Sequence, residues 1–166
     1  MTDGRAPRSR GESGRLTRVP SKPEPRISYI VGRLDRALSL AVEERVAEHG
    51  LTLPQYTALS VLRLRPGLSN AQLARRTFVR PQSMMQVISR LEAAGLIERT
   101  PDANHGRILR TEISARGREV LAACDRSVSA MERTMLSGMD GEQRDAFRDA
   151  LLDCVRRLGA GLDDVG

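Results

Sequence analysis

Hydrophobic residues recur at steps of three and four from residue 27 onward. This spacing is shared by Ile27, Ile30, Val31, Leu34, Leu38, Val42 and Val46. It places them on one helical face and predicts a helix over residues 27–49, ended by His49 and Gly50. Residues 1–26 differ, because they hold four of the eight prolines and scarcely any large apolar side chain. Such a segment cannot offset its ordering entropy by burial, so we expect a disordered basic tail over residues 1–26.

The next apolar stripes begin at helix-capping patterns. Thr52 to Gln55 forms a capping box that opens a helix carrying Tyr56, Leu59 and Leu62, which runs to Pro66-Gly67. Ser69 to Gln72 forms another and opens a short helix with Leu73 and Ala74 inward. Pro81 then starts a further helix, closed by Gly95, whose apolar stripe is Met84 or Met85 with Ile88, Leu91 and Ala94. Two helices separated by a short turn predict a helix-turn-helix.

Two short strands follow. Residues 96–100 and 107–113 read as strands, and the dense cluster of turn residues over 101–106 reads as the connection between them. A hairpin directly after a helix-turn-helix is a wing. We therefore predict a winged helix-turn-helix over residues 52–113.

The last third of the chain predicts two more amphipathic helices. Ser114 can cap one that runs to about Leu136, and a capping box from Asp140 to Gln143 precedes one bearing Phe147, Leu151, Val155 and Leu158. These helices and the one over 27–49 expose more apolar surface than a small winged domain can cover. The expected fold is mainly α with a small β-wing, in one domain over 27–166, with dimerisation helices over 27–49 and 114–160 that pair two copies of the chain.

Charge is concentrated where a nucleic acid would bind. The chain has 27 basic and 21 acidic residues, a net charge of +6, of which residues 1–26 carry +4. Residues 69–116 also carry +4, with eight arginines against four acids. Such arginines could line one continuous phosphate-facing surface. Aromatic residues make up only 2% of the chain, which argues against an RNA-stacking sheet.

The helix that starts at Pro81 carries side chains suited to reading bases. The candidate DNA-binding residues are Arg80, Gln82, Ser83, Gln86 and Arg90, with Arg107 of the wing as a candidate for the minor groove. Gln pairs with adenine and Arg with guanine through two hydrogen bonds, and Ser contacts either base or phosphate. The alternative is that these side chains are a solvated helix face and a solvent-facing turn arginine.

Other classes of function find little support. Cys124 and Cys154 lack zinc-site or disulfide spacing, and there is no signal peptide or membrane-length apolar run. Catalytic motifs are also absent, and His49 and His105 are far apart in sequence. We expect a cytoplasmic protein that uses no metal or cofactor, does not bind a membrane and is not an enzyme.

Several segments together carry a family resemblance. These are Leu51-Thr-Leu-Pro-Gln-Tyr56, Leu68-Ser-Asn-Ala-Gln-Leu-Ala74, Pro81-Gln-Ser-Met84, Arg90-Leu-Glu-Ala-Ala-Gly-Leu96 and Glu98-Arg99. With them the chain resembles the multiple-antibiotic-resistance regulator (MarR) family over nearly everything after the tail. The resemblance implies a cytoplasmic, nucleoid-associated bacterial homodimer, usually a repressor. Such a repressor binds a double-stranded, pseudo-palindromic operator and is released by a small phenolic or anionic effector or by cysteine oxidation.

Two positions depart from the family pattern. Arg80 stands where members often have a Ser or Thr cap, and Gly106 replaces one arginine of the usual wing pair. Arg80 gives up side-chain capping but adds a cation at the DNA end of the helix, so we expect an altered operator preference. Without its second arginine, the wing is expected to hold DNA less tightly through Arg107.

The resemblance also implies an effector pocket between the dimer helices and the winged lobe. Its candidate polar groups are Tyr29, Arg33, His49 and Tyr56, each with a structural alternative as a core aromatic, a surface residue or a helix-end residue. Cys124 and Cys154 fit buried small hydrophobes better than redox sensors. A competing function is a non-specific architectural nucleic-acid binder, which would show strong salt dependence without sequence discrimination.

Overall fold

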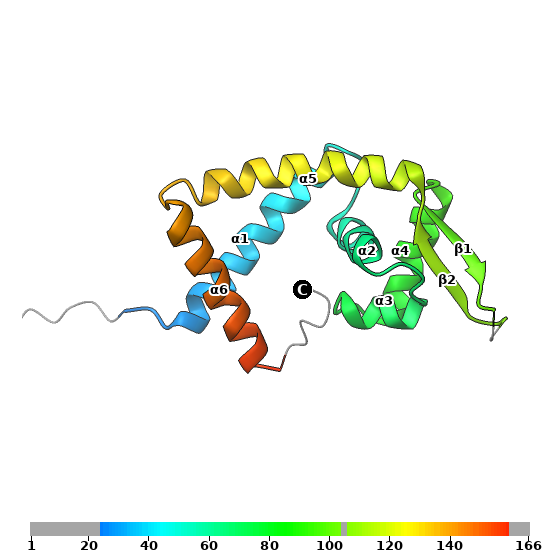
Figure 1. The fold of residues 1–166 in the computed structure, drawn as a ribbon, viewed down its shortest axis with the longest axis horizontal. Helices are drawn as coiled ribbons and strands as arrows, with labels where there is room; N and C mark the ends of the chain where they lie inside the picture. The colour runs from blue at the N-terminus through cyan, green and yellow to red at the C-terminus, as the bar shows by residue number, and fades with distance from the viewer. Residues whose placement is uncertain (1–23, 104–105, 160–166) are drawn as a thin grey trace, which may run out of the picture.

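The computed structural model describes residues 24–103 and 106–159, which form six helices and one two-stranded sheet (Figure 1). In chain order these are α1 (Ile27–Ala47), α2 (Leu53–Leu64), α3 (Asn70–Arg76), α4 (Pro81–Ala93), β1 (Ile97–Pro101), β2 (Leu109–Ile113), α5 (Ala115–Met135) and α6 (Gly141–Arg157). This order confirms the predicted winged helix-turn-helix with flanking helices. Of the predicted tail, residues 1–23 lie outside the described residues, as does His105.

The helices begin where the local sequence predicts. Capping boxes open α2 at Thr52, α3 at Ser69 and α6 at Asp140. At α5, Ser114 Oγ accepts a hydrogen bond from the Gly117 N–H at 2.9 Å. Arg80 precedes α4 without a side-chain cap, as its chemistry predicts. Local hydrogen bonding therefore sets four of the six helix starts.

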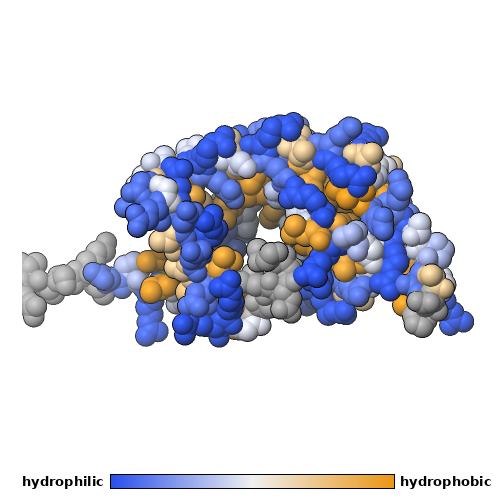
Figure 2. Space-filling model, in the orientation of Figure 1, coloured by the Kyte–Doolittle hydropathy of each residue, from blue (hydrophilic) through white to orange (hydrophobic). Residues whose placement is uncertain are grey.

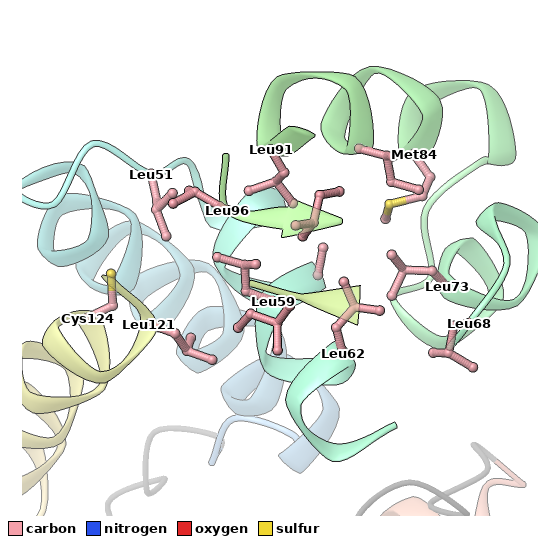
Figure 3. Close-up of a cluster of buried hydrophobic side chains, with 14 of the residues drawn as sticks. Leu51, Leu59, Leu62, Leu68, Leu73, Met84, Leu91, Leu96, Leu121 and Cys124 are labelled. Carbon is pink, nitrogen blue, oxygen red and sulfur yellow. The ribbon is translucent and has the colours of Figure 1, made fainter. Parts of the chain in front are cut away.

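The core of the winged lobe is aliphatic (Figure 3). Leu59 and Leu62 of α2 are fully buried and lie among side chains of α3, α4, α5 and the wing. In α4 the buried methionine is Met84, whereas Met85 is 61% exposed, which decides between the two candidates for its apolar stripe. Burying these side chains fixes which face of α4 points outward.

The wing is an antiparallel hairpin in which Ile97 pairs with Ile113 and Pro101 with Leu109. Its strands begin one and two residues later than predicted, at Ile97 and Leu109 rather than at residues 96 and 107. Leu96 instead follows the turn that closes α4, where its N–H donates to Leu91 O at 2.9 Å. The ladder thus starts only after the chain has left the helix.

The outer helices leave apolar side chains uncovered. In Figure 1, α5 runs from the wing across to α6, and α1 crosses below it. α6 has no buried residue, and α1 buries only Val46. Exposed hydrophobic side chains on these three helices are Ile27, Tyr29, Ile30, Val31, Leu40, Met135 and Leu151, and Figure 2 shows hydrophobic residues at the surface where α1 and α6 cross. An apolar groove of about 660 Å³ also opens between α1, α5 and α6.

The two cysteines differ in exposure. Cys124 is fully buried against the core, as predicted, but Cys154 is exposed on α6. The prediction that both are buried is therefore wrong for Cys154 within one chain, because α6 packs so little against its own chain. Within the described ranges, no helix is long and apolar enough to cross a membrane, and no cluster of His, Cys, Asp or Glu could hold a metal ion.

Candidate nucleic-acid interface

The outer face of α4 presents polar side chains to solvent. Gln82, Ser83, Gln86 and Arg90 are all exposed, while Met84, Ile88 and Leu91 on the opposite face are buried. Gln82, Met85, Gln86, Ser89 and Arg90 line one open groove along this face. Because the buried face anchors α4 in the core, the outer side chains form a stripe with a fixed orientation, of the kind that reads base edges in a major groove.

Two hydrogen bonds to α3 fix the turn before α4. Asn70 at the start of α3 donates from Nδ2 to Pro81 O at 3.1 Å, and the Val79 N–H donates to Ala74 O at 3.0 Å. Phe78 in this turn has φ +54° and is the one non-glycine residue with positive φ in the described part of the chain. The residue is 85% exposed. The turn therefore stores some backbone strain while it positions the start of α4.

The eight arginines of residues 69–116 do not form one phosphate-facing surface. Those with exposed side chains are Arg75, Arg80, Arg90, Arg107 and Arg116. Arg99 lies 3.5 Å from Glu92 in an ion pair, and Arg110 is paired with Asp102. The expectation of a continuous arginine surface is therefore wrong for Arg99 and Arg110, whose charges acids of this chain already balance. Arg107 is exposed next to the wing turn, where a guanidinium can reach a minor groove.

Arg110 instead ties the wing to the helix-turn-helix. Its Nε donates to Asp102 Oδ2 at 2.5 Å, and its Nη1 donates to Gly67 O and to Gln72 Oε1, both at 3.2 Å. These partners are 8, 43 and 38 residues away in the sequence, so no local pattern announces the contact. Sequence spacing places Arg110 among the DNA-facing arginines and gives no sign of this positioning role.

Two of the four predicted effector residues face α5. The Tyr56 hydroxyl donates to Asp125 Oδ1 at 2.9 Å, and Arg63 donates to the other oxygen of the same carboxylate. His49 Nε2 lies 2.9 Å from Ser127 Oγ, two residues further along α5 and therefore roughly 200° around that helix from Asp125. Burial, with a smaller effect from Asp125, raises the pKa of Tyr56 from 10.0 to about 12. The phenol therefore stays protonated and remains a hydrogen-bond donor at neutral pH.

The other two predicted effector residues lie elsewhere. Tyr29 and Arg33 are exposed in the first two turns of α1, whereas His49 follows its last turn. At 1.5 Å per residue, roughly 25 Å of helix separates the two pairs. The structure thus brings His49 and Tyr56 against α5, on either side of its buried stripe of Leu121, Cys124 and Val128, but does not bring Tyr29 and Arg33 to that helix within one chain. Asp125, Arg63 and Ser127 were not among the predicted residues, since only the fold places them there.

An amphipathic second helix behind a braced turn, followed by a two-stranded wing, defines a winged helix-turn-helix DNA-binding protein. A family model described as the MarR family matches residues 49–108. The HTH-type transcriptional repressor Rv2887 of Mycobacterium tuberculosis is 34% identical over 125 residues, which cover 75% of this chain and 90% of that protein. The chain belongs to the MarR family of transcriptional regulators.

Solved structures agree with this assignment. The crystal structure of Rv2887 in complex with DNA has a TM-score of 0.70 and 30% identity, and the match covers 79% of this chain and 98% of that one. The same protein in complex with salicylic acid has a TM-score of 0.66 and 32% identity, with 79% and 97% coverage. The MarR family transcription regulator SP03579 has a TM-score of 0.72 and 25% identity, with 80% and 88% coverage. The fold and family expected from the sequence are thereby confirmed.

Proposed function

We propose that this chain is a homodimeric repressor that binds a pseudo-palindromic operator through α4 and the wing, and that a small aromatic anion releases it. The observation that carries the proposal is the outer face of α4, where Gln82, Ser83, Gln86 and Arg90 are exposed around one groove while the opposite face is locked in the core. The DNA complex of the similar protein Rv2887 supports the same use of the fold.

The uncovered helices support the dimer. α6 makes few contacts with the rest of its own chain, and the apolar groove between α1, α5 and α6 is open. A second copy that packs its own α1 and α6 against these surfaces would bury them, and two-fold pairing is the commonest arrangement. Two α4 helices would then meet successive major grooves, about 34 Å apart.

The junction of α1, α2 and α5 is the proposed effector site. Tyr56 and Arg63 both bind Asp125 of α5 there, and the Arg63 side chain is 47% exposed to solvent. His49 contacts Ser127 on the other flank of α5. An aromatic carboxylate could pair with Arg63 and accept from the Tyr56 hydroxyl in competition with Asp125. The salicylic acid complex of Rv2887 supports this ligand class. Tyr29 and Arg33 remain candidates only for a site that a second chain completes. Coupling between effector and operator of about 1 to 3 kcal/mol would suffice for release.

The proposal is tested by selecting bound fragments from a random double-stranded DNA library at two salt concentrations. The wild type is compared with Gln82→Ala, Arg107→Ala and, as a control, Arg126→Ala, an exposed arginine of α5. We expect a palindrome with half-sites one helical turn apart, blurred by Gln82→Ala. Arg107→Ala should weaken binding across sequences and lower the salt slope by about 1 per chain, and Arg126→Ala should change neither.

A lack of any enriched site, with binding that only weakens as salt rises, would contradict the proposal and favour a non-specific architectural binder. With the selected operator in hand, salicylate should release the protein while the uncharged benzyl alcohol should not. Tyr56→Phe and His49→Ala should raise the salicylate concentration required. A repressor of this kind acts at the nucleoid, in the bacterial cytoplasm, and needs no catalytic step.

A further inference from the structure

One side chain on the outer face of α4 differs chemically from its neighbours. Met85 is 61% exposed, although the methionine beside it, Met84, is fully buried. The groove that Met85 lines is otherwise made by Gln82, Gln86, Ser89 and Arg90, so all its lining residues come from α4. An unbranched apolar side chain therefore stands in water among two amides, a hydroxyl and a guanidinium.

The surfaces left open for a second copy do not account for this exposure. In Figure 1, α4 lies with α3 and the wing at one end of the molecule, while α6 and the start of α1 lie at the other. The apolar groove between α1, α5 and α6 contains no residue of α4. Pairing through that groove would leave Met85 on the face that carries the base-reading side chains.

We propose that Met85 is a specificity-determining residue that packs against the 5-methyl group of a thymine in each operator half-site. The inference rests on the proposed function, because it requires α4 to enter the major groove. It assigns to this chain a preference for thymine over cytosine at one position that Gln82, Gln86 and Arg90 do not read.

The chemistry of the major groove supports this pairing. The thymine methyl is the one apolar group that the four base pairs present there, while the other distinguishing atoms are hydrogen-bond donors and acceptors. A thioether side chain has no donor and only a weak acceptor, so it cannot read those atoms. Its three rotatable bonds and polarisable sulfur let it adapt to a methyl group. Cytosine carries only a hydrogen at C5, so the same side chain would lose the methyl contact there, which disfavours that base.

The experiment removes the methyl group and leaves the Watson–Crick edge unchanged. In the operator selected by the wild type, each thymine is replaced in turn by deoxyuridine, and affinities are measured by fluorescence anisotropy. At one position, which occurs once in each half-site of the palindrome, loss of the methyl should weaken wild-type binding about fourfold per half-site. Met85→Ala should bind the thymine and deoxyuridine operators equally, whereas Met85→Leu should retain the difference. Gln82→Ala should also retain it, although it loses discrimination at its own base.

The outcomes separate this inference from the proposed function. If an operator is selected but deoxyuridine has no effect at any position, or if Met85→Ala keeps the wild-type deoxyuridine profile, the role of Met85 is overturned while the reading by Gln82 stands. If no operator is enriched, the proposed function fails and this inference fails with it. Thermal unfolding of Met85→Ala should match the wild type, because the side chain it shortens lies in solvent.

Discussion

Arg110 and Gln72 share a hydrogen bond that joins the wing to the helix-turn-helix. Gln72 Oε1 accepts from Arg110 Nη1 at 3.2 Å and from the Ser69 N–H at 2.9 Å, so one oxygen both caps α3 and holds the wing. Since Asp102 and Gly67 bind the same guanidinium, the root of the wing has a fixed position relative to α3.

Arg110→Ala should therefore loosen the wing. Loss of these charge-assisted bonds, at a side chain 34% exposed, is expected to lower the free energy of unfolding by about 1 to 2 kcal/mol. Amide hydrogen exchange in residues 97–113 should become faster, and operator affinity should fall. Arg107→Ala is the matched control, since it removes an exposed wing arginine and should leave both stability and exchange unchanged. Equal exchange in the two variants would show that Arg110 does not hold the wing.

Tyr56 should lose its proton at a higher pH than an ordinary tyrosine. The free energy of unfolding should fall over the same pH range. Its pKa of about 12 in the folded chain exceeds the ordinary 10.0. The stabilisation linked to its neutral form is thus complete below pH 10 and is lost as the pH rises toward 12. With two tyrosines and no tryptophan, absorbance at 295 nm should show a step near pH 12. Tyr56→Phe should remove this step and Tyr29→Phe should keep it.

The same variants test the linkage to stability. Between pH 10 and 11.5, the free energy of unfolding should fall more steeply for the wild type and Tyr29→Phe than for Tyr56→Phe. Burial also raises the pKa of the Cys124 thiol, and that contribution is common to all three proteins. A Tyr56→Phe protein with the wild-type slope would rule out the linkage.

Gly117 should not tolerate a side chain. A Cβ built on it would lie 2.0 Å from Leu96 O and 2.8 Å from Ile113 Cγ1, so the first turn of α5 could not stay against the wing. Gly117→Ala is expected to destabilise the protein by about 3 kcal/mol, although alanine favours a helix. Gly138→Ala, where nothing lies within 4 Å, should stay within about 0.5 kcal/mol of the wild type. Urea unfolding at one protein concentration measures both, and similar midpoints for the two variants would contradict the clash.

Replacing Phe78 with glycine should raise the free energy of unfolding, whereas replacing it with alanine should not. Its φ of +54° is unfavourable for any residue with a Cβ, by about 1 to 2 kcal/mol, and its exposed ring contributes little burial. Part of the gain on Phe78→Gly is offset by the greater freedom of glycine in the unfolded chain. We expect Phe78→Gly to exceed Phe78→Ala in unfolding free energy by about 1 kcal/mol. No difference between them would mean that the turn relaxes at no cost.

Features set by neighbouring residues were predictable from the sequence, and features set by distant ones were not. The Ser69 to Gln72 capping box and the buried stripe of α4 follow from spacings of three and four residues. The bond between Tyr56 and Asp125 spans 69 positions, and the wing brace by Arg110 spans 38. Phe78 was also beyond prediction, since local preference would place glycine or asparagine at a positive φ. The outer face of α4 was identified correctly because amphipathic periodicity is itself local.

The scant packing of α6 against its own chain affects how much regulator a cell can hold. If pairing is what buries α6 and the exposed side of α1, folding and association are one event, and a tenfold dilution costs about 1.4 kcal/mol of apparent stability. At low gene expression an unpaired chain would wait longer for a partner and would stay open to proteases for that time. The abundance of the protein would therefore fall more steeply than its rate of synthesis. The regulator would then accumulate only above a threshold rate of synthesis. That threshold would be set by the same helices that hold the two α4 helices of the dimer apart.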